Sequence, residues 1–424
     1  MPISVTCDEC FRDYSVPERF AGRKVKCKGC GATMTVPDGV EVAEDDNEFA
    51  DVPMTAPAAP LPAGRSRSKP AAKAADSSIF RSAGFWIAAI AGSVMVGILV
   101  CCGGGVLWVR STIDAGPVEI YANQPEHGDP TTPFPVAKIP VPLFPDLGEP
   151  TPIDGSDVQT YFVDLGANPA NDGAAGMKMS MRVYLPPGEH DPQSLACVLV
   201  APAGTDLLSG MSLDDGDYHD ETLPYAEAGM AVIHYSIDGA DEVSIDDENP
   251  VSVFYLHFRA AAAGIVNTRN AFEFALAKLP MVDPQKIYTA GHSSAGTLAL
   301  LAAEHESRLA GAIAYAPAAD VESRLKELAE APMLVTAIFP KVKEFVTQSS
   351  PTTHAAILKQ PVFLFHAKDD GNVPFADTQR FADRLRENGT DVTLETVETG
   401  DHYDPMISDG IPRAIEWISD RSGT

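Results

Sequence analysis

Apolar runs and amphipathic segments alternate along the chain from about residue 156 onward. Short apolar runs bounded by Gly, Pro, Asn and Asp predict eight strands, over Val158–Leu165, Met177–Leu185, Ala196–Ala201, Met230–Ser236, Ile287–Ala290, Gly311–Ala316, Pro361–Ala367 and Val392–Val397. Helical spacing of apolar residues predicts helices over Thr222–Ala228, Val253–Leu279, Gly296–Glu304, Ala376–Asn388 and Pro412–Asp420. The later strands alternate with helices, so the pattern predicts an α/β domain over residues 156–424 with a mostly parallel sheet covered on both faces.

A second pattern is the long apolar run over residues 84–109, which contains no charged residue. A bilayer core of about 30 Å needs about 20 helical residues, so this run is long enough to span it. A signal peptide would be shorter and would begin near the N-terminus. The run therefore predicts a single transmembrane helix.

The charges that flank this run predict its orientation. Basic residues precede it, at Arg65, Arg67, Lys69, Lys73 and Arg81, and acidic residues follow it, at Asp114, Glu119, Glu126 and Asp129. Because positive flanks stay in the cytoplasm, we expect a cytoplasmic N-terminus and an extracytoplasmic C-terminal domain.

The segments on either side of the predicted span have a low-complexity composition. Residues 39–82 combine an acidic patch with Ala, Pro, Ser and basic residues, which is typical of a disordered cytoplasmic linker. Residues 110–155 are rich in proline and are expected to form an extended spacer. Residues 1–38 form a separate small unit.

Charge and cysteine content narrow the functions open to the large domain. The formal net charge of the chain is −28, and a surface this acidic repels phosphate backbones, so nucleic acid is not an expected partner of this domain. Cys197 is the one cysteine after the apolar run, which excludes an internal disulfide there.

Four cysteines at the N-terminus form two closely spaced pairs. Cys7 and Cys10 are separated by two residues, as are Cys27 and Cys30, and sixteen residues lie between the pairs. Two such turns can offer four thiolates to one tetrahedral zinc ion and leave no open position for catalytic water. Disulfides or redox thiols are the alternatives, and both fit less well with a cytoplasmic location and the absence of a βαβ pattern.

The stretch CDECFRDYSVPERFAGRKVKCKGCGATMTVP resembles a short zinc-ribbon module found at the N-termini of many bacterial membrane proteins. The resemblance implies a small docking or binding module with a structural zinc ion. It does not identify the partner of this module.

The segment VDPQKIYTAGHSSAG has the layout of a nucleophile elbow. A short strand ending at Ala290 leads into Gly291-His292-Ser293-Ser294-Ala295, and an alanine-rich helix follows. Small residues two positions before and after the serine permit the sharp turn that exposes a nucleophilic Oγ. Ser293 is therefore the candidate nucleophile, and Ala295 stands where a second glycine is usual.

Two further motifs supply the partners that a serine nucleophile needs. A buried-strand run ends in Asp369-Asp370-Gly-Asn-Val373-Pro374, and the spacing to Val-Pro favours Asp370 over Asp369 as the orienting carboxylate. His402 follows the last predicted strand, downstream of this acid, and is the candidate general base. His366 and His292 are expected to be structural.

The oxyanion of an acyl-transfer reaction needs two hydrogen-bond donors. The backbone N–H of Ser294, at the start of the helix, is the first candidate. The second is expected in the loop after the third strand, from the N–H of Gly204 or Thr205, although Pro-Ala-Gly replaces the usual His-Gly there.

Residues 156–424 resemble the α/β-hydrolase superfamily, and in detail the catalytic domain of prolyl-oligopeptidase-like (S9) proteins and related esterases. The segments that carry the resemblance are VDPQKIYTAGHSSAG, SPTTHAAILKQPVFLFHAKDDGNVP and TGDHYDP. It implies a triad of Ser293, Asp370 and His402 without a catalytic cofactor. A Pro-rich segment precedes the domain instead of a β-propeller, and the elbow lacks a double glycine, which favours a carboxylesterase over a peptidase.

The preferred interpretation is a membrane-anchored serine hydrolase that cleaves an ester or a peptide bond of a small substrate. The alternative is a non-catalytic envelope binding or sensing protein that retains the hydrolase fold. The segment Val321–Thr353 is expected to cap the pocket, where Met333, Leu334, Ile338 and Phe339 either line an acyl site or pack as core.

Overall fold

The computed structural model describes residues 3–6, 13–16, 24–26, 33–35, 126–171, 175–213, 219–240, 251–330 and 338–423. The chain divides into two compact units, Met1–Lys73 and Ala74–Thr424. Within the described residues, no helix combines the length and the apolar character needed to cross a bilayer. The predicted span over residues 84–109 lies outside this part of the chain, as do the predicted linker at 39–82 and the start of the predicted spacer.

The N-terminal unit contains two short antiparallel pairs of strands. Strand β1 (Ile3–Thr6) pairs with β2 (Asp13–Val16), and β3 (Lys24–Lys26) pairs with β4 (Thr33–Thr35). In the sequence, each connection between paired strands contains one cysteine pair. The four cysteines themselves lie outside the described residues, and the described ones include no cluster that could hold a metal ion.

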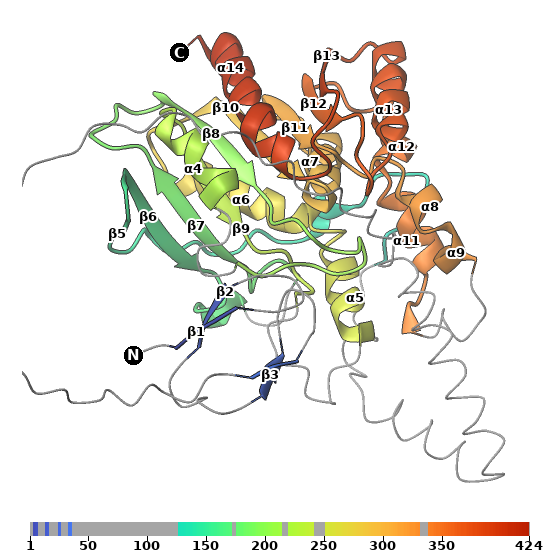
Figure 1. Cartoon of the computed structure of the whole chain (residues 1–424), viewed down its shortest axis with the longest axis horizontal. Helices are drawn as coiled ribbons and strands as arrows, with labels where there is room; N and C mark the ends of the chain where they lie inside the picture. Colours follow the sequence, from blue (N-terminus) through green and yellow to red (C-terminus); the bar gives the residue numbers. More distant parts are fainter. Residues whose placement is uncertain are drawn as a thin grey trace, which may run out of the picture. The chain divides into compact units, whose positions relative to one another are not determined.

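A nine-stranded sheet forms the centre of the large unit, in the order β13-β12-β11-β10-β8-β9-β7-β6-β5 (Figure 1). Its strands are β5 (Thr151–Ile153), β6 (Ser156–Asp164), β7 (Ser180–Leu185), β8 (Leu195–Val200), β9 (Ala231–Tyr235), β10 (Val282–His292), β11 (Gly311–Tyr315), β12 (Val362–Ala367) and β13 (Val392–Val397). Strands β8 to β13 run parallel to one another. Strands β5, β6 and β7 pair antiparallel, and β7 pairs antiparallel with β9. The prediction of a mostly parallel α/β sheet is confirmed.

The sheet has one strand more than the eight that the sequence predicts. Strand β5 lies inside the Pro-rich segment and contains Pro152. Proline removes a backbone donor, so it is tolerated at a sheet edge, and β5 is the outermost strand.

Helices cover both faces of the sheet and bury two apolar clusters. They are α4 (His219–Glu227), α5 (Val251–Ala260), α6 (Ile265–Lys278), α7 (Ser294–His305), α8 (Val321–Arg324), α9 (Lys326–Ala329), α11 (Val342–Gln348), α12 (Pro351–His354), α13 (Phe375–Glu387) and α14 (Ile411–Ser422). Strand β8 shows the alternation that builds both layers. Its Cys197 and Leu199 join the cluster with α6, α7 and α13, while Val198 and Val200 join the cluster with α4 and α14.

One predicted helix is divided in two. The sequence predicts a single helix over Val253–Leu279, but the structure has α5 and α6 with a break between them. Ala262, Ala263 and Gly264 adopt positive φ values of 53°, 57° and 86°, so the chain leaves the right-handed helical region there.

The Pro-rich segment lies against the large unit from residue 126 onward. Phe134 is buried beside His305 and Phe345, and Nη1 of Arg269 on α6 donates to the backbone oxygens of Val136 and Ile139 at 2.7 Å each. This part of the predicted spacer therefore packs on the domain that it precedes.

Candidate active site

Ser293 occupies the sharp turn between β10 and α7. Its φ of 53° and ψ of −117° place a non-glycine residue in a strained conformation, and its amide donates to the backbone oxygen of Tyr315 over 2.8 Å. A Cβ at Gly291 would lie 2.4 Å from the carbonyl carbon of Ala295. Because Gly291 has no side chain, the buried Ala295 fits where a second glycine is usual.

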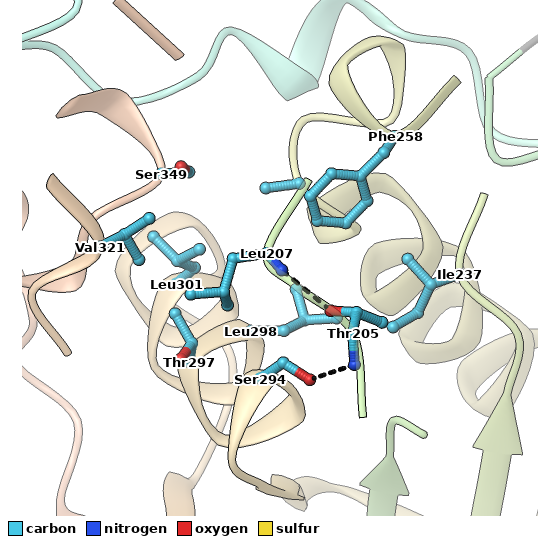
Figure 2. A pocket seen from close by; sticks show the side chains of 11 residues that line it. Thr205, Leu207, Ile237, Phe258, Ser294, Thr297, Leu298, Leu301, Val321 and Ser349 are labelled. Carbon is cyan, nitrogen blue, oxygen red and sulfur yellow. Dashed lines mark hydrogen bonds between the residues drawn. The ribbon is translucent and has the colours of Figure 1, made fainter. Parts of the chain in front are cut away.

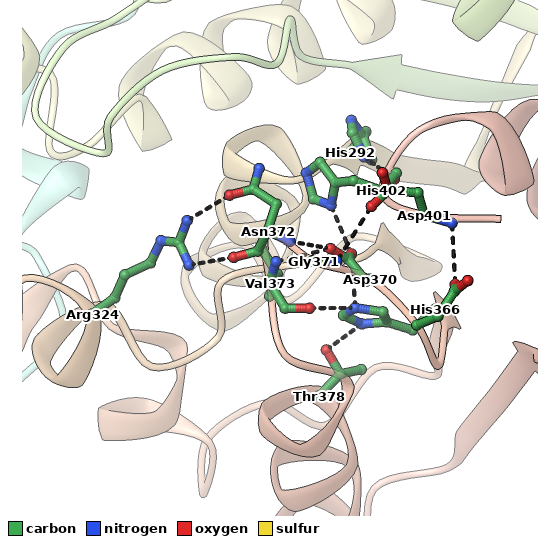
Figure 3. Close-up of polar contacts among 11 residues, drawn as sticks. His292, Arg324, His366, Asp370, Gly371, Asn372, Val373, Thr378, Asp401 and His402 are labelled. Atoms are coloured by element: carbon green, nitrogen blue, oxygen red, sulfur yellow. Dashed lines mark hydrogen bonds and ion pairs between the residues drawn. The ribbon is translucent and has the colours of Figure 1, made fainter. Parts of the chain in front are cut away.

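His402 and Asp370 are brought together from two loops that follow parallel strands. Asp370 follows β12 and His402 follows β13, so both lie at the carboxyl edge of the sheet, as does Ser293 after β10. Nδ1 of His402 lies 2.7 Å from Oδ2 of Asp370, whose carboxylate is fully buried (Figure 3). The amides of Asn372 and Val373 also donate to this carboxylate, at 2.8 and 2.9 Å.

This contact fixes the tautomer of His402. A carboxylate only accepts hydrogen bonds, so Nδ1 carries the proton and Nε2 carries the lone pair. Nε2 is buried and forms no hydrogen bond to any residue that the structure describes. His402 therefore has the arrangement of an imidazole that can accept a proton at Nε2, and no hydrogen bond joins it to the Ser293 hydroxyl within the described residues.

His366 at the end of β12 holds the other side of Asp370 (Figure 3). Its Nε2 lies 3.0 Å from both Oδ2 of Asp370 and the backbone oxygen of Val373, and its Nδ1 lies 2.8 Å from the Thr378 hydroxyl. Burial alone would raise the pKa of Asp370, but the hydrogen bonds from His366, His402 and the Val373 amide outweigh it and hold the pKa well below its ordinary value. Asp370 is therefore a carboxylate at neutral pH.

Two residues beside the triad candidates anchor the segment that carries His402. Asp369 accepts hydrogen bonds from the amides of Gly400 and Asp401 at 3.2 and 3.1 Å. Asp369 thus binds the backbone before His402, whereas Asp370 binds the ring of His402. Nε2 of His292 lies 2.9 Å from the backbone oxygen of His402. Burial, followed by the charge of His402, lowers the pKa of His292 to about 4, so its ring is neutral at pH 7.

A buried carboxyl group on α4 contacts the residue after His402. Glu221 is 5% exposed and is hydrogen-bonded to the side chain of Tyr403. Burial raises the pKa of Glu221 to about 7, against the opposing effect of the Tyr403 hydroxyl. The ring of Tyr403 also meets His292 edge-on, with centroids 5.4 Å apart.

The three candidate oxyanion residues also come together. The amides of Gly204 and Thr205 each lie 3.2 Å from Oγ of Ser294. Figure 2 shows the contact with Thr205. Gly204 has a φ of 99°, which glycine adopts without strain. Both amides in the predicted loop are thus directed at the side chain of the residue after Ser293.

The described parts of the segment Val321–Thr353 contain the short helices α8, α9 and α11 and the start of α12, of which the sequence predicted none. Met333 and Leu334 lie outside the described residues. Arg324 on α8 donates from both terminal nitrogens to Asn372, at 3.2 Å each, and so contacts the loop after Asp370 (Figure 3). Phe339 packs against the core, where its ring meets Tyr255 edge-on.

The partners of His366, Asp369 and His292 were not predicted from the sequence, and those of Asp369 and His292 lie in segments that are distant from them in sequence. One local pattern pointed to the first of them. His366 stands four residues before Asp370 at the end of a buried strand, so a short turn can return the carboxylate to the imidazole.

Comparison with known proteins identifies the type of domain. Residues 263–419 match the prolyl oligopeptidase family, and this range contains Ser293, Asp370 and His402. The sequence matches no curated protein at a significant level.

Many solved structures match this chain. An acetyl xylan esterase from Paenibacillus sp. R4 is 18% identical with a TM-score of 0.47, over 71% of this chain and 99% of that one. A puromycin-hydrolyzing peptidase from Mycobacterium tuberculosis is also 18% identical with a TM-score of 0.47, over 64% of this chain and 40% of that one. An esterase from the planctomycete Thermogutta terrifontis is 18% identical with a TM-score of 0.43, over 68% and 94%.

The sheet topology, the elbow and the family match lead to one conclusion. The large unit of this chain has the α/β-hydrolase fold, and its residues 263–419 are similar to the prolyl oligopeptidase family.

Proposed function

We propose that the large domain is a serine hydrolase that cleaves carboxylic esters through Ser293, His402 and Asp370. The observation that carries this proposal is the 2.7 Å contact between Nδ1 of His402 and a buried Asp370 carboxylate, which leaves Nε2 of His402 as a buried acceptor. The elbow supports it, because its strained turn presents Ser293 at the same edge of the sheet.

The proposed reaction follows from these proton positions. Nε2 of His402 takes the Ser293 proton as Oγ attacks the ester carbon, and Asp370 stabilises the resulting imidazolium. Collapse of the tetrahedral intermediate breaks the bond to the alcohol, which receives the proton from His402. Water then attacks the acyl-enzyme with His402 again as base, which releases the acid and restores Ser293.

The positive end of α7 would stabilise the oxyanion of both intermediates. Ser294 is the first helical residue, so its amide has no acceptor within the helix. The helix dipole adds a partial positive charge at the same place.

An amide bond is the second candidate for the bond that is cleaved. The match of residues 263–419 to the prolyl oligopeptidase family favours it. Amides have poorer leaving groups than activated esters, so an esterase and a peptidase differ in their relative rates on matched substrates.

Matched acyl substrates provide the test. The purified full chain is assayed with p-nitrophenyl esters and with peptide p-nitroanilides, next to Ser293→Ala and His402→Ala. We expect ester turnover that both substitutions reduce by about 10⁴-fold or more. Ser194→Ala, at an exposed serine, serves as the matched control and keeps full activity.

Turnover also separates the enzyme from a binding protein that keeps the fold. A folded chain without turnover and without reaction with a fluorophosphonate would favour an envelope binding or sensing function. Faster cleavage of anilides than of esters with the same acyl group would favour the peptidase.

We further propose that residues 84–109 anchor the protein in a membrane, with the N-terminus in the cytoplasm and the hydrolase domain outside it. The uncharged apolar run supports the anchor, and the basic residues before it support the orientation. Protease added to intact spheroplasts should digest the hydrolase domain. Protection of that domain would contradict this orientation, and release of the protein by alkaline carbonate would contradict the anchor.

We also propose that Cys7, Cys10, Cys27 and Cys30 bind one structural zinc ion. The two antiparallel strand pairs support this site, because the connection within each pair contains two of the cysteines. Zinc would hold the two connections together. One zinc ion per chain by mass spectrometry under native conditions is expected, and loss of zinc in Cys10→Ser but not in Cys197→Ser tests the ligands.

A further inference from the structure

The hydroxyl of Ser294 has an unusual set of partners. Its oxygen accepts hydrogen bonds from the successive amides of Gly204 and Thr205, each at 3.2 Å, of which Figure 2 shows the one from Thr205. Ser294 is 9% exposed, so water has little access to this oxygen. The two amides therefore fix its position from the side of the β8–α4 loop.

These contacts determine what the hydroxyl can still do. A serine hydroxyl has one proton to donate and two lone pairs that accept. Both lone pairs are used by the amides, so the proton is the remaining hydrogen-bonding group. No hydrogen bond from this proton to another described residue is present. Two accepted hydrogen bonds also polarise the O–H group, which makes it a better donor.

The location of Ser294 defines the acceptor for this proton. The residue directly follows Ser293 and begins α7, so it lies next to the nucleophile in the chain and at the positive end of the helix. A negative oxygen forms at this place when Ser293 attacks an acyl group. The amides of Gly204 and Thr205 cannot reach that oxygen while Ser294 occupies them.

We infer that the Ser294 side chain is a catalytic residue, which donates its hydroxyl proton in a hydrogen bond to the oxyanion. The amides of Gly204 and Thr205 then act as positioning groups that hold the Ser294 oxygen. This inference rests on the proposed function, and it assigns the second oxyanion donor to a side chain instead of the loop backbone.

A small cavity beside Ser294 offers a matched control. The cavity, of about 20 Å³, is lined by Thr205, Ser294, Thr297 and Ser349 together with apolar side chains (Figure 2). Ser349 is also a buried serine, 3% exposed, but its hydroxyl has no partner among the described residues. Ser349→Ala thus removes a hydroxyl from the same cavity without touching the three oxyanion candidates.

The test compares Ser294→Ala, Ser294→Thr and Ser349→Ala in the full chain with p-nitrophenyl acetate. Loss of a transition-state donor should lower kcat of Ser294→Ala by about 10²-fold and leave KM within about threefold. The affinity for a trifluoromethyl ketone, which forms a hemiketal oxyanion on Ser293, should fall by a similar factor. Ser294→Thr keeps a hydroxyl and should keep kcat within about tenfold, and Ser349→Ala within about twofold.

Three results would overturn the inference. A kcat of Ser294→Ala equal to or above that of the unsubstituted chain would mean that Ser294 blocks the amides and that they are the donors. A lower kcat with unchanged ketone affinity, or a Ser294→Thr as slow as Ser294→Ala, would indicate a structural role. The triad proposal fails separately, if Ser293→Ala retains turnover.

Discussion

Nε2 of His292 donates a hydrogen bond to the backbone oxygen of His402 over 2.9 Å, and the two rings lie 4.5 Å apart between centroids. The residue directly before Ser293 thus holds the segment that carries the proposed base. The carbonyl oxygen can only accept, so His292 is protonated on Nε2. This hydrogen bond joins the nucleophile elbow to the loop that carries His402, and the Ser293 hydroxyl takes no part in it.

Substitution of His292 should therefore impair catalysis without touching the triad. His292→Ala removes the donor and leaves the partly buried carbonyl of His402 without this partner. We expect kcat with p-nitrophenyl acetate to fall by about tenfold and KM to change little, because a misplaced base affects the transition state most. His190→Ala is the control, at a histidine whose ring contacts the backbone oxygen of Pro186. Equal activity of both variants would contradict a positioning role.

Loss of His366 should change how the free energy of unfolding depends on pH in the acidic range. A carboxylate with a lowered pKa contributes stability that is present above its unfolded-state pKa, about 3.9, and is lost as pH falls through the folded-state pKa. His366→Ala removes one of the hydrogen bonds that lower the pKa of Asp370. The variant should unfold more readily at pH 7, and its deficit should narrow below about pH 4.

Thr378→Val is the control for this measurement. It removes the hydroxyl at Nδ1 of His366 but leaves the contact of Nε2 with Asp370. Urea unfolding at several pH values compares the two variants. A deficit of His366→Ala that is constant with pH would show that the imidazole does not act through the carboxylate.

Because of Glu221, the free energy of unfolding should fall as the pH rises. Burial raises its pKa to about 7, whereas the unfolded chain releases the proton near its ordinary value of 4.5. Unfolding therefore releases a proton between these values, and stability falls as pH rises from about 4.5 to 7. Glu221→Gln removes this dependence and should be more stable than the unsubstituted chain at pH 8, by up to about 3 kcal/mol.

Thermal unfolding at pH 5 and pH 8 measures this difference. Glu227→Gln changes an exposed carboxyl group on the same helix and should show no such gain. A Glu221→Gln variant that is less stable at pH 8 would mean that the buried carboxylate is needed in its charged form.

The architecture could be predicted because most strands of the sheet appear in the sequence as short, continuous apolar segments. All eight predicted strands are present, since strands such as β8 and β12 are buried along their whole length and leave unbroken apolar segments. Strand β5 was missed because Pro152 argues against a strand unless its edge position is known. The break before α6 was missed because two alanines with positive φ carry no local signal.

The triad could be proposed from the sequence because its members follow strand ends in a fixed chain order. Asp370 and His402 lie 32 residues apart in sequence, and their 2.7 Å contact agrees with the sequence-based assignment. The partners of the triad could not be predicted in the same way. The contact of His292 with His402 and those of Ser294 with Gly204 and Thr205 depend on how distant loops meet, and so does the contact of Arg324 on α8 with Asn372.

Our central proposal is that Ser293 is the nucleophile. A test must therefore distinguish Ser293 from the adjacent Ser294. The most direct measurement is reaction of the full chain with a fluorophosphonate, followed by mass spectrometry of the peptide that contains both serines. We predict one adduct per chain, on Ser293, with no adduct in Ser293→Ala and a slower reaction in Ser294→Ala. An adduct on Ser294, or an unchanged adduct in Ser293→Ala, would contradict this account.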